Sequence, residues 1–198
     1  MTERETEIIF LLDRSGSMHI CEDDAIGGYN SFLDRQRLEG GRAYVTTVLF
    51  DNHYDVLCEH EDIHGTFRLT GREYFARGST ALLDAIGLTI SRAAKRQSEQ
   101  GGAAKTLMVI ITDGLDNMSR VYSIKTIHEM IHEREEHGWE FIFLGADMES
   151  LRTAQSIGIP NERSGQFTKT DIRQKFEGLS GTVSHFRTSG EVNQDWQV

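Results

Sequence analysis

The chain has 198 residues, enough for one domain with a full hydrophobic core, and its formal net charge is −10. That acidic balance argues against nucleic-acid binding, because nucleic-acid-binding domains usually carry a basic patch. The two cysteines, Cys21 and Cys58, have no metal-binding or redox spacing, the opening residues MTERETE contain no apolar signal segment, and no apolar run is long enough to span a bilayer. We therefore expect a cytoplasmic protein that binds neither nucleic acid nor a membrane.

The first half of the chain alternates between strand-like and helix-like stretches. Continuous apolar or β-branched runs indicate strands, and apolar residues three or four positions apart indicate helices. Asp51-Asn52 is prone to form a turn, so the run after it is expected to fold back as an antiparallel edge strand. In chain order the predicted elements are a strand over 7–12, a helix over 24–38 that ends at Gly40-Gly41, a strand over 43–50, the edge strand over 54–57, a surface loop over 59–79 and a helix over about 80–97.

The second half continues the alternation. The runs LMVIIT and EFIFLGA are apolar throughout, as strands buried on both faces are. Gly158-Ile159-Pro160 is expected to stop a short helix, because proline cannot continue one. In chain order the predicted elements are a strand over 107–112, a helix over 123–136, a strand over 140–146, a helix over 148–158, a brief strand near 166–167, a helix over 170–185 and a loose end.

This order of elements predicts the fold class. Strands separated by helices form right-handed βαβ units, and continuous apolar strands fit a sheet that is covered on both faces. The predicted fold is α/β: a Rossmann-like, doubly wound, mostly parallel sheet with one antiparallel edge strand and helices on both faces. We expect a single domain over 1–198, with a core over about 7–184 and a loose C-terminal tail over 185–198.

Oxygen-bearing side chains directly follow two of the predicted strands. The run IIFLL leads into Asp13, with Ser15 and Ser17 at alternate positions after it, and LMVIIT leads into Asp113. In an open doubly wound sheet, ligands bind at the carboxyl ends of the strands where the strand order reverses. If the two strands are neighbours there, about 4.8 Å apart, both carboxylates face one site. Thr80, at a predicted helix start, would reach the same site from a third loop.

Such a set of side chains predicts a site for a hard cation. Carboxylate and hydroxyl oxygens suit Mg²⁺, Mn²⁺ or Ca²⁺ and do not suit a soft metal. Two carboxylates balance the charge of a divalent ion, whereas hydroxyls are neutral and weak donors. The ion would therefore stay electrophilic and accept one more anionic oxygen from outside the chain.

The motif Asp13-x-Ser15-x-Ser17, with Thr80 in GST and Asp113 in TDG, resembles the metal-ion-dependent adhesion site of von Willebrand factor A-type domains. Integrin inserted domains belong to the same group. The resemblance covers most of the chain and includes the placement of each motif after its expected element. It implies the von Willebrand A fold, with Mg²⁺ or Mn²⁺, ahead of Ca²⁺, at the metal site. With no signal peptide and no evident disulfide, the chain is more similar to the intracellular, bacterial-type branch than to the adhesive members.

The resemblance also implies a role for each of the five residues. Ser15 and Ser17 would coordinate the ion directly, and Thr80 would do so directly or through water. Asp13 and Asp113 would act through water or as hydrogen-bond partners. The remaining coordination position would take a Glu or Asp side chain from a partner protein. The expected function is therefore a non-enzymatic, divalent-metal-dependent protein-binding module.

Three other functions remain open at this point. The stretch HEMIH over 128–132 fits the H-E-x-x-H pattern of zinc proteases, which also need a third ligand and a cleft over that helix. An aspartate at a strand end also occurs in phosphotransfer enzymes, which suggests a metal-dependent phosphohydrolase. Intracellular members of the resembled family often accompany ATPases, so a scaffold subunit of an ATPase-driven assembly is the third alternative.

Overall fold

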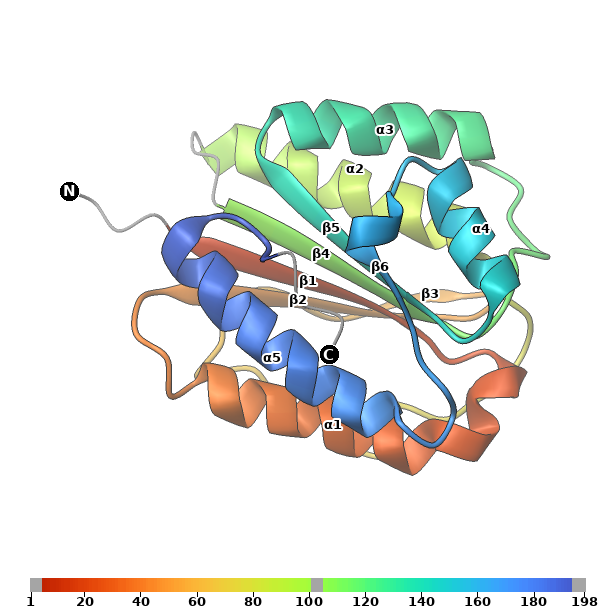
Figure 1. Ribbon diagram of the computed structural model, residues 1–198, viewed down its shortest axis with the longest axis horizontal. Coiled ribbons are helices and arrows are strands. Elements are labelled where there is room, and N and C mark those ends of the chain that lie inside the picture. The colour runs from red at the N-terminus through yellow and green to blue at the C-terminus, as the bar shows by residue number, and fades with distance from the viewer. Residues whose placement is uncertain (1–4, 101–104, 194–198) are drawn as a thin grey trace.

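A six-stranded sheet lies at the centre of the computed structural model, which describes residues 5–100 and 105–193 (Figure 1). The strand order is β3-β2-β1-β4-β5-β6, with β3 antiparallel to β2 and the other neighbouring pairs parallel. The predicted doubly wound α/β fold with an antiparallel edge strand is confirmed. In chain order the strands are β1 (Thr6–Asp13), β2 (Ala43–Phe50), β3 (Tyr54–Asp62), β4 (Lys105–Thr112), β5 (Trp139–Gly145) and β6 (Ser164–Gln166).

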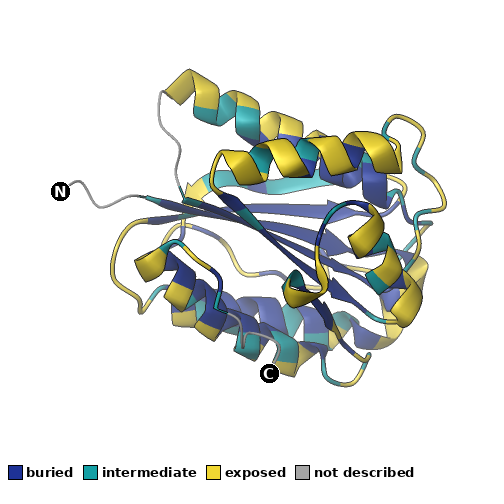
Figure 2. Ribbon diagram, turned by 45° about the horizontal axis from the view of Figure 1, so that its top comes forward, coloured by how far each residue is buried: buried dark blue, intermediate teal, exposed yellow. Residues whose placement is uncertain are grey.

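Helices cover both faces of this sheet. One face carries α1 (Glu22–Gln36) and α5 (Ile172–Ser189), and the opposite face carries α2 (Leu82–Gln100), α3 (Ile124–Glu136) and α4 (Met148–Ser156), as Figure 1 shows. Each helix turns its buried side toward the sheet and its exposed side outward (Figure 2). Of the helices in the described ranges, none has the length and apolar character to cross a bilayer.

The central strand β1 is buried on both faces, which explains its continuous apolar run. Ile8 and Phe10 face α1 and α5, and the Phe10 ring meets the Phe32 ring edge-on with 4.8 Å between centroids. Ile9 and Leu11 belong to the core on the side of α2 and α3. Burying a side chain of this kind contributes roughly 1.5–3 kcal/mol, so β1 is a rigid support for the loop that follows it.

The strand order reverses between β1 and β4. These two strands pair in parallel, with Leu12 opposite Ile111, while β2 lies on the other side of β1. The chain continues from β1 into a helix on one face and from β4 into a helix on the other. This is the point of a doubly wound sheet at which ligands bind.

The first helix differs from the prediction at both ends. A 3₁₀ helix, η1 (Gly16–Cys21), precedes α1, and α1 ends at Gln36 with Arg37 as its C-cap. The prediction that Gly40-Gly41 ends this helix is therefore wrong. The carbonyl oxygens of these glycines instead accept hydrogen bonds of 2.9 and 3.0 Å from Arg187 in α5, a contact that local sequence does not reveal.

The predicted surface loop over 59–79 is also partly wrong. β3 continues to Asp62, and beyond it Leu69 and Tyr74 are buried in the core, 2% and 1% exposed. The side-chain amide of Asn30 in α1 holds the Leu69 backbone with two hydrogen bonds of 2.9 and 2.8 Å. Single apolar anchors among polar residues have no periodicity, so the sequence pattern did not mark them.

The last helix is longer than predicted. α5 continues to Ser189, and Gly190 caps it in the left-handed conformation with a φ of 85°. The first residues of the predicted tail over 185–198 are therefore helical, and Val192 beyond them packs into the core. Residues 194–198 lie outside the described ranges.

Candidate functional site

The carboxyl ends of β1 and β4 bring four of the five predicted site residues together. Asp13 is the last residue of β1, Ser15 and Ser17 follow at the start of η1, and Asp113 directly follows β4. The predicted adjacency of the two strands is confirmed by their parallel pairing. The site therefore lies at the point where the strand order of the sheet reverses.

Asp13 is a fully buried carboxylate whose two oxygens both accept hydrogen bonds. Oδ1 accepts a 2.6 Å bond from the Ser15 backbone N–H, and Oδ2 accepts a 2.5 Å bond from the Thr112 hydroxyl. Burial raises the pKa of Asp13 to about 6, and the neighbouring Asp113 charge acts in the same direction, against the hydrogen bonds that lower it. Among the described residues, Asp13 has hydrogen-bond donors but no ion-pair partner for its negative charge.

A chain of hydroxyl contacts connects the first loop to Asp113. The Ser15 and Ser17 hydroxyl oxygens lie 3.1 Å apart, and the Ser17 hydroxyl donates a 2.6 Å hydrogen bond to Asp113 Oδ1. Two serine hydroxyls from the first loop and a carboxylate from the second therefore share one small volume. The 3₁₀ helix begins at Gly16, between the two serines, and the chain turn there brings their hydroxyl groups together.

Thr80, the fifth predicted residue, is held against the loop that carries Asp113. Its backbone N–H donates to Asn117 Oδ1 at 2.9 Å, and its carbonyl accepts from the Asn117 N–H at 3.0 Å. Its hydroxyl oxygen lies 3.0 Å from where a Cβ on Gly114 would be, so a larger residue at position 114 would press against Thr80. Thr80 therefore belongs to the same cluster of loops, although no hydrogen bond joins its hydroxyl to the two serines among the contacts described.

The loop after β4 is fastened to the start of α2. Both oxygens of Asp84 take part: Oδ2 accepts from the N–H of Arg120, and Oδ1 from those of Val121 and Tyr122, each at 2.9 Å. The Ser119 hydroxyl accepts the Asp84 N–H, also at 2.9 Å. Asp84 and Asn117 were not singled out from the sequence, because their role depends on two loops meeting in space.

A partly buried ion-pair cluster holds the first loop from the other side. Arg14, whose side chain is 4% exposed, donates from Nε to Asp51 Oδ2 at 3.1 Å and also pairs with Asp55. Arg77 donates to the same Asp51 oxygen at 2.7 Å. Burial raises the pKa of Asp51, but the hydrogen bonds from Arg77 and His53, with the charge of Arg14, outweigh it and lower the pKa overall. The cluster fixes the backbone between β1 and η1.

Lys169 is a further site residue that sequence reasoning missed. It comes from the segment between β6 and α5, and its ammonium nitrogen lies 2.8 Å from Asp113 Oδ2 and 2.6 Å from the Ser17 carbonyl oxygen. A single lysine in a polar stretch carries no sequence signal of this kind. The contact joins residues 152 positions apart, which only the folded chain brings together.

The residues at this site fit a hard divalent cation. All the donors are oxygens, two of them from buried carboxylates, as Mg²⁺ and Mn²⁺ require. Asp113 Oδ2 is buried and, within the described part of the chain, accepts no aligned hydrogen bond. The positively charged group beside it is the Lys169 ammonium, which contacts both Asp113 Oδ2 and the Ser17 carbonyl oxygen.

The H-E-x-x-H stretch does not form a comparable cluster. His128 lies on the exposed side of α3 near Gly158, and the His132 side chain is 66% exposed and 3.8 Å from Glu136. Among residues 5–100 and 105–193, no group of three or more His, Cys, Asp or Glu side chains is arranged to hold a metal. The geometry of the described residues therefore offers no third zinc ligand beside this helix.

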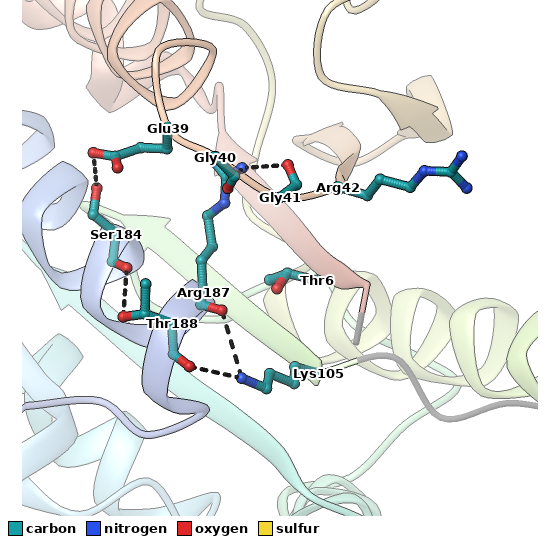
Figure 3. Close-up of a pocket in the computed structure, with 9 residues that line it drawn as sticks. All are labelled: Thr6, Glu39, Gly40, Gly41, Arg42, Lys105, Ser184, Arg187 and Thr188. Atoms are coloured by element: carbon teal, nitrogen blue, oxygen red, sulfur yellow. Dashed lines mark hydrogen bonds between the residues drawn. The ribbon is translucent and has the colours of Figure 1, made fainter. Parts of the chain in front are cut away.

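A cavity of about 410 Å³ lies at the opposite, amino end of the sheet (Figure 3). Two of the basic side chains that line it, Arg187 and Lys105, already donate hydrogen bonds to backbone carbonyl groups of this chain. Arg187 donates to the carbonyls of Gln36, Gly40 and Gly41, and the Lys105 ammonium lies 3.2 Å from the Thr188 carbonyl. These contacts tie the end of α1 to the end of α5, so they have a structural role.

Comparison with family models finds no match for this sequence, and comparison with curated proteins finds none either. Many solved structures have a similar fold. The vWF domain of the type V pili tip protein Mfa5 from Porphyromonas gingivalis aligns over 98% of this chain and 99% of its own, with 9% identity and a TM-score of 0.70. Manganese-loaded TRAP protein from Plasmodium vivax aligns over 88% of this chain and 72% of its own, with 15% identity and a TM-score of 0.60.

A von Willebrand factor type A protein from Catenulispora acidiphila aligns over 91% of this chain and 43% of its own, with 15% identity and a TM-score of 0.62. The chain spans less than half of the length of several matched proteins, this one included. At such low identities the likeness establishes the fold. The chain therefore has the fold of von Willebrand factor type A domains, and its predicted site residues lie at the carboxyl edge of the central sheet.

Proposed function

We propose that this chain is a non-enzymatic protein-binding module whose site holds Mg²⁺ or Mn²⁺ and accepts a carboxylate from a partner protein. The observation that carries the proposal is the row of contacts from the Ser15 hydroxyl through the Ser17 hydroxyl to the Asp113 carboxylate, in which every polar atom is an oxygen that could bind a metal ion. Two neighbours of the same fold are in keeping with it: one is a manganese-loaded protein and one is a pilus tip protein.

Each residue of the site has a part in this proposal. Ser15, Ser17 and Thr80 would offer hydroxyl oxygens to the ion, while Asp13 and Asp113 supply the negative charge that balances it. Both Asp13 oxygens already accept hydrogen bonds, which suits a residue that orients the loop and acts through water. When bound, the ion supplies a Lewis-acidic centre for an external carboxylate. The chain's own residues position the ligands and shield the two carboxylates from solvent.

Calorimetric titration with Mn²⁺ tests the metal site directly. We expect one ion per chain in the wild type and none in Asp113→Ala, whose circular dichroism should be unchanged because Asp113 follows β4 and belongs to neither hydrophobic core. Asp23→Ala is the matched control, since Asp23 is an exposed carboxylate in the first turn of α1. Full Mn²⁺ binding by Asp113→Ala would show that the metal does not bind at the proposed site.

The carboxylate-accepting step needs a separate measurement. Water-proton relaxation of the Mn²⁺-loaded protein reports water molecules on the ion, and a peptide that contains glutamate should lower it by displacing one. The same peptide with glutamine in place of glutamate should leave the relaxation unchanged. Equal effects of the two peptides would contradict acceptance of a carboxylate while leaving the metal site intact.

A further inference from the structure

Lys169 places a cation against two of the proposed metal ligands. Its ammonium nitrogen is 2.8 Å from Asp113 Oδ2 and 2.6 Å from the Ser17 carbonyl oxygen. The Ser17 hydroxyl donates at the same time to the other Asp113 oxygen, at 2.6 Å. The lysine thus contacts the same loop and the same carboxylate that the proposal assigns to the divalent ion.

The segment that carries Lys169 has a defined backbone. It runs between β6 and α5 and passes beside η1 and the start of α1 (Figure 1). The Phe167 N–H donates to the Gly145 carbonyl at 2.9 Å, and the Thr168 N–H donates to Asp171 Oδ1 at 2.6 Å. The contact with Asp113 is therefore made from an anchored position, by a side chain that is 32% exposed.

Charge balance explains why a cation is held there. The Asp113 side chain is 1% exposed and Asp13 is fully buried, and the charge of Asp113 acts on Asp13, so two neighbouring carboxylates receive little help from solvent. Burying such charges is costly unless they are paired. A lysine ammonium and a divalent ion beside the same Asp113 carboxylate would repel each other, because like charges at this separation interact strongly in a poorly solvated site.

We propose that Lys169 is a tethered cation that neutralises Asp113 when the divalent ion is absent and is displaced when the ion binds. This inference rests on the proposed metal site. Metal binding is then an exchange of one cation for another, and it couples the occupancy of the site to the segment between β6 and α5. The site still binds the divalent ion. Lys169 sets the affinity for that ion and the structural change that accompanies its binding.

Removing the lysine charge tests the exchange. Lys169→Met keeps most of the aliphatic stem and should bind Mn²⁺ about tenfold more tightly than the wild type, which corresponds to about 1.4 kcal/mol. It should also melt at a lower temperature than the wild type without metal and at the same temperature with saturating Mn²⁺. Lys169→Arg, which retains the charge, should bind Mn²⁺ like the wild type.

A second lysine serves as the control for net charge. Lys125 at the start of α3 has an 86% exposed side chain 3.8 Å from Glu129, and Lys125→Met removes the same unit charge without touching Asp113. Its Mn²⁺ affinity should match the wild type. An equal gain in Lys125→Met and Lys169→Met would overturn the inference, since general electrostatic attraction would then account for both.

The possible outcomes separate this inference from the proposed function. Wild-type Mn²⁺ affinity in Lys169→Met would overturn the exchange and leave the metal site standing. Mn²⁺ binding by Lys169→Met but not by the wild type would support Lys169 as the tethered cation and overturn metal dependence in the wild type. Absence of binding in both proteins would overturn both ideas.

Hydrogen exchange of the unmodified protein gives an independent reading. If Lys169 leaves Asp113 on metal binding, amides over 167–171 should exchange faster when Mg²⁺ is added. The same comparison in Lys169→Met should show little change, because the tether is already absent. Unchanged protection of this segment in wild-type protein that demonstrably binds Mg²⁺ would overturn the displacement.

Discussion

The Thr112 hydroxyl donates a 2.5 Å hydrogen bond to Asp13 Oδ2, so the last residue of β4 holds the carboxylate at the end of β1. Both side chains are fully buried. The same hydroxyl oxygen accepts the Gly114 N–H at 3.2 Å, which sets the direction of the loop after β4. One side chain therefore links the two strand ends on which the candidate metal site depends.

Thr112→Val should destabilise the metal-free protein at pH 7. Valine has nearly the shape of threonine but cannot donate, so a buried carboxylate oxygen loses its partner, at a cost of about 1–3 kcal/mol. Urea denaturation measures the difference, with Thr112→Ser as the control that keeps the hydroxyl. A valine variant as stable as the wild type would show that Asp13 does not depend on this bond.

Stability of the metal-free protein should depend on pH through Asp13. Its pKa is raised from 3.8 to about 6, so the folded state binds more protons than the unfolded state between these values. By linkage, this group's contribution to stability falls as pH rises from about 4 to above 6, and is regained on acidification. The difference in unfolding free energy between wild type and Asp13→Asn, measured from pH 4.5 to 7.5, isolates it from other groups. A flat difference would contradict the raised pKa.

Mg²⁺ or Mn²⁺ should raise the melting temperature, and EDTA should reverse the effect. At a free ion concentration a hundredfold above Kd, binding to the folded state alone adds about 2.7 kcal/mol of stability. Ca²⁺ at the same concentration should have a smaller effect. Differential scanning fluorimetry of protein first stripped of metal makes the comparison, and a melting curve indifferent to Mg²⁺ and Mn²⁺ would count against a formed site.

Asp51→Asn should be strongly destabilising. Asp51 and Arg14 have side chains that are 0% and 4% exposed, and removing one partner of a buried pair typically costs about 3–5 kcal/mol. Asp34→Asn is the control, because Asp34 pairs with Arg37 and Arg68 but is 46% exposed. Exposed pairs contribute about 0–1 kcal/mol, so a similar loss in both variants would place the effect outside the Arg14 cluster.

Local patterns were sufficient to predict most of the fold. The continuous apolar runs of β1, β4 and β5 marked strands buried on both faces, and helical spacing marked α1, α2 and α3. Both signals are short-range consequences of side-chain burial, so they can be read from neighbouring residues. Isolated anchors such as Leu69 and Tyr74 could not be read this way, because each is buried by residues distant in sequence.

The same distinction applies to the candidate site. Asp13, Ser15, Ser17 and Asp113 could be placed from sequence because each lies at the end of a recognisable strand or within a few residues after it, and parallel strands end at a common edge. The contacts that complete the site join distant segments: Thr112 to Asp13 and Lys169 to Asp113. A lysine in a polar stretch looks the same in sequence whether its ammonium is solvated or paired. Only tertiary packing decides this, because β4 brings the Asp113 carboxylate to the segment between β6 and α5 that carries Lys169.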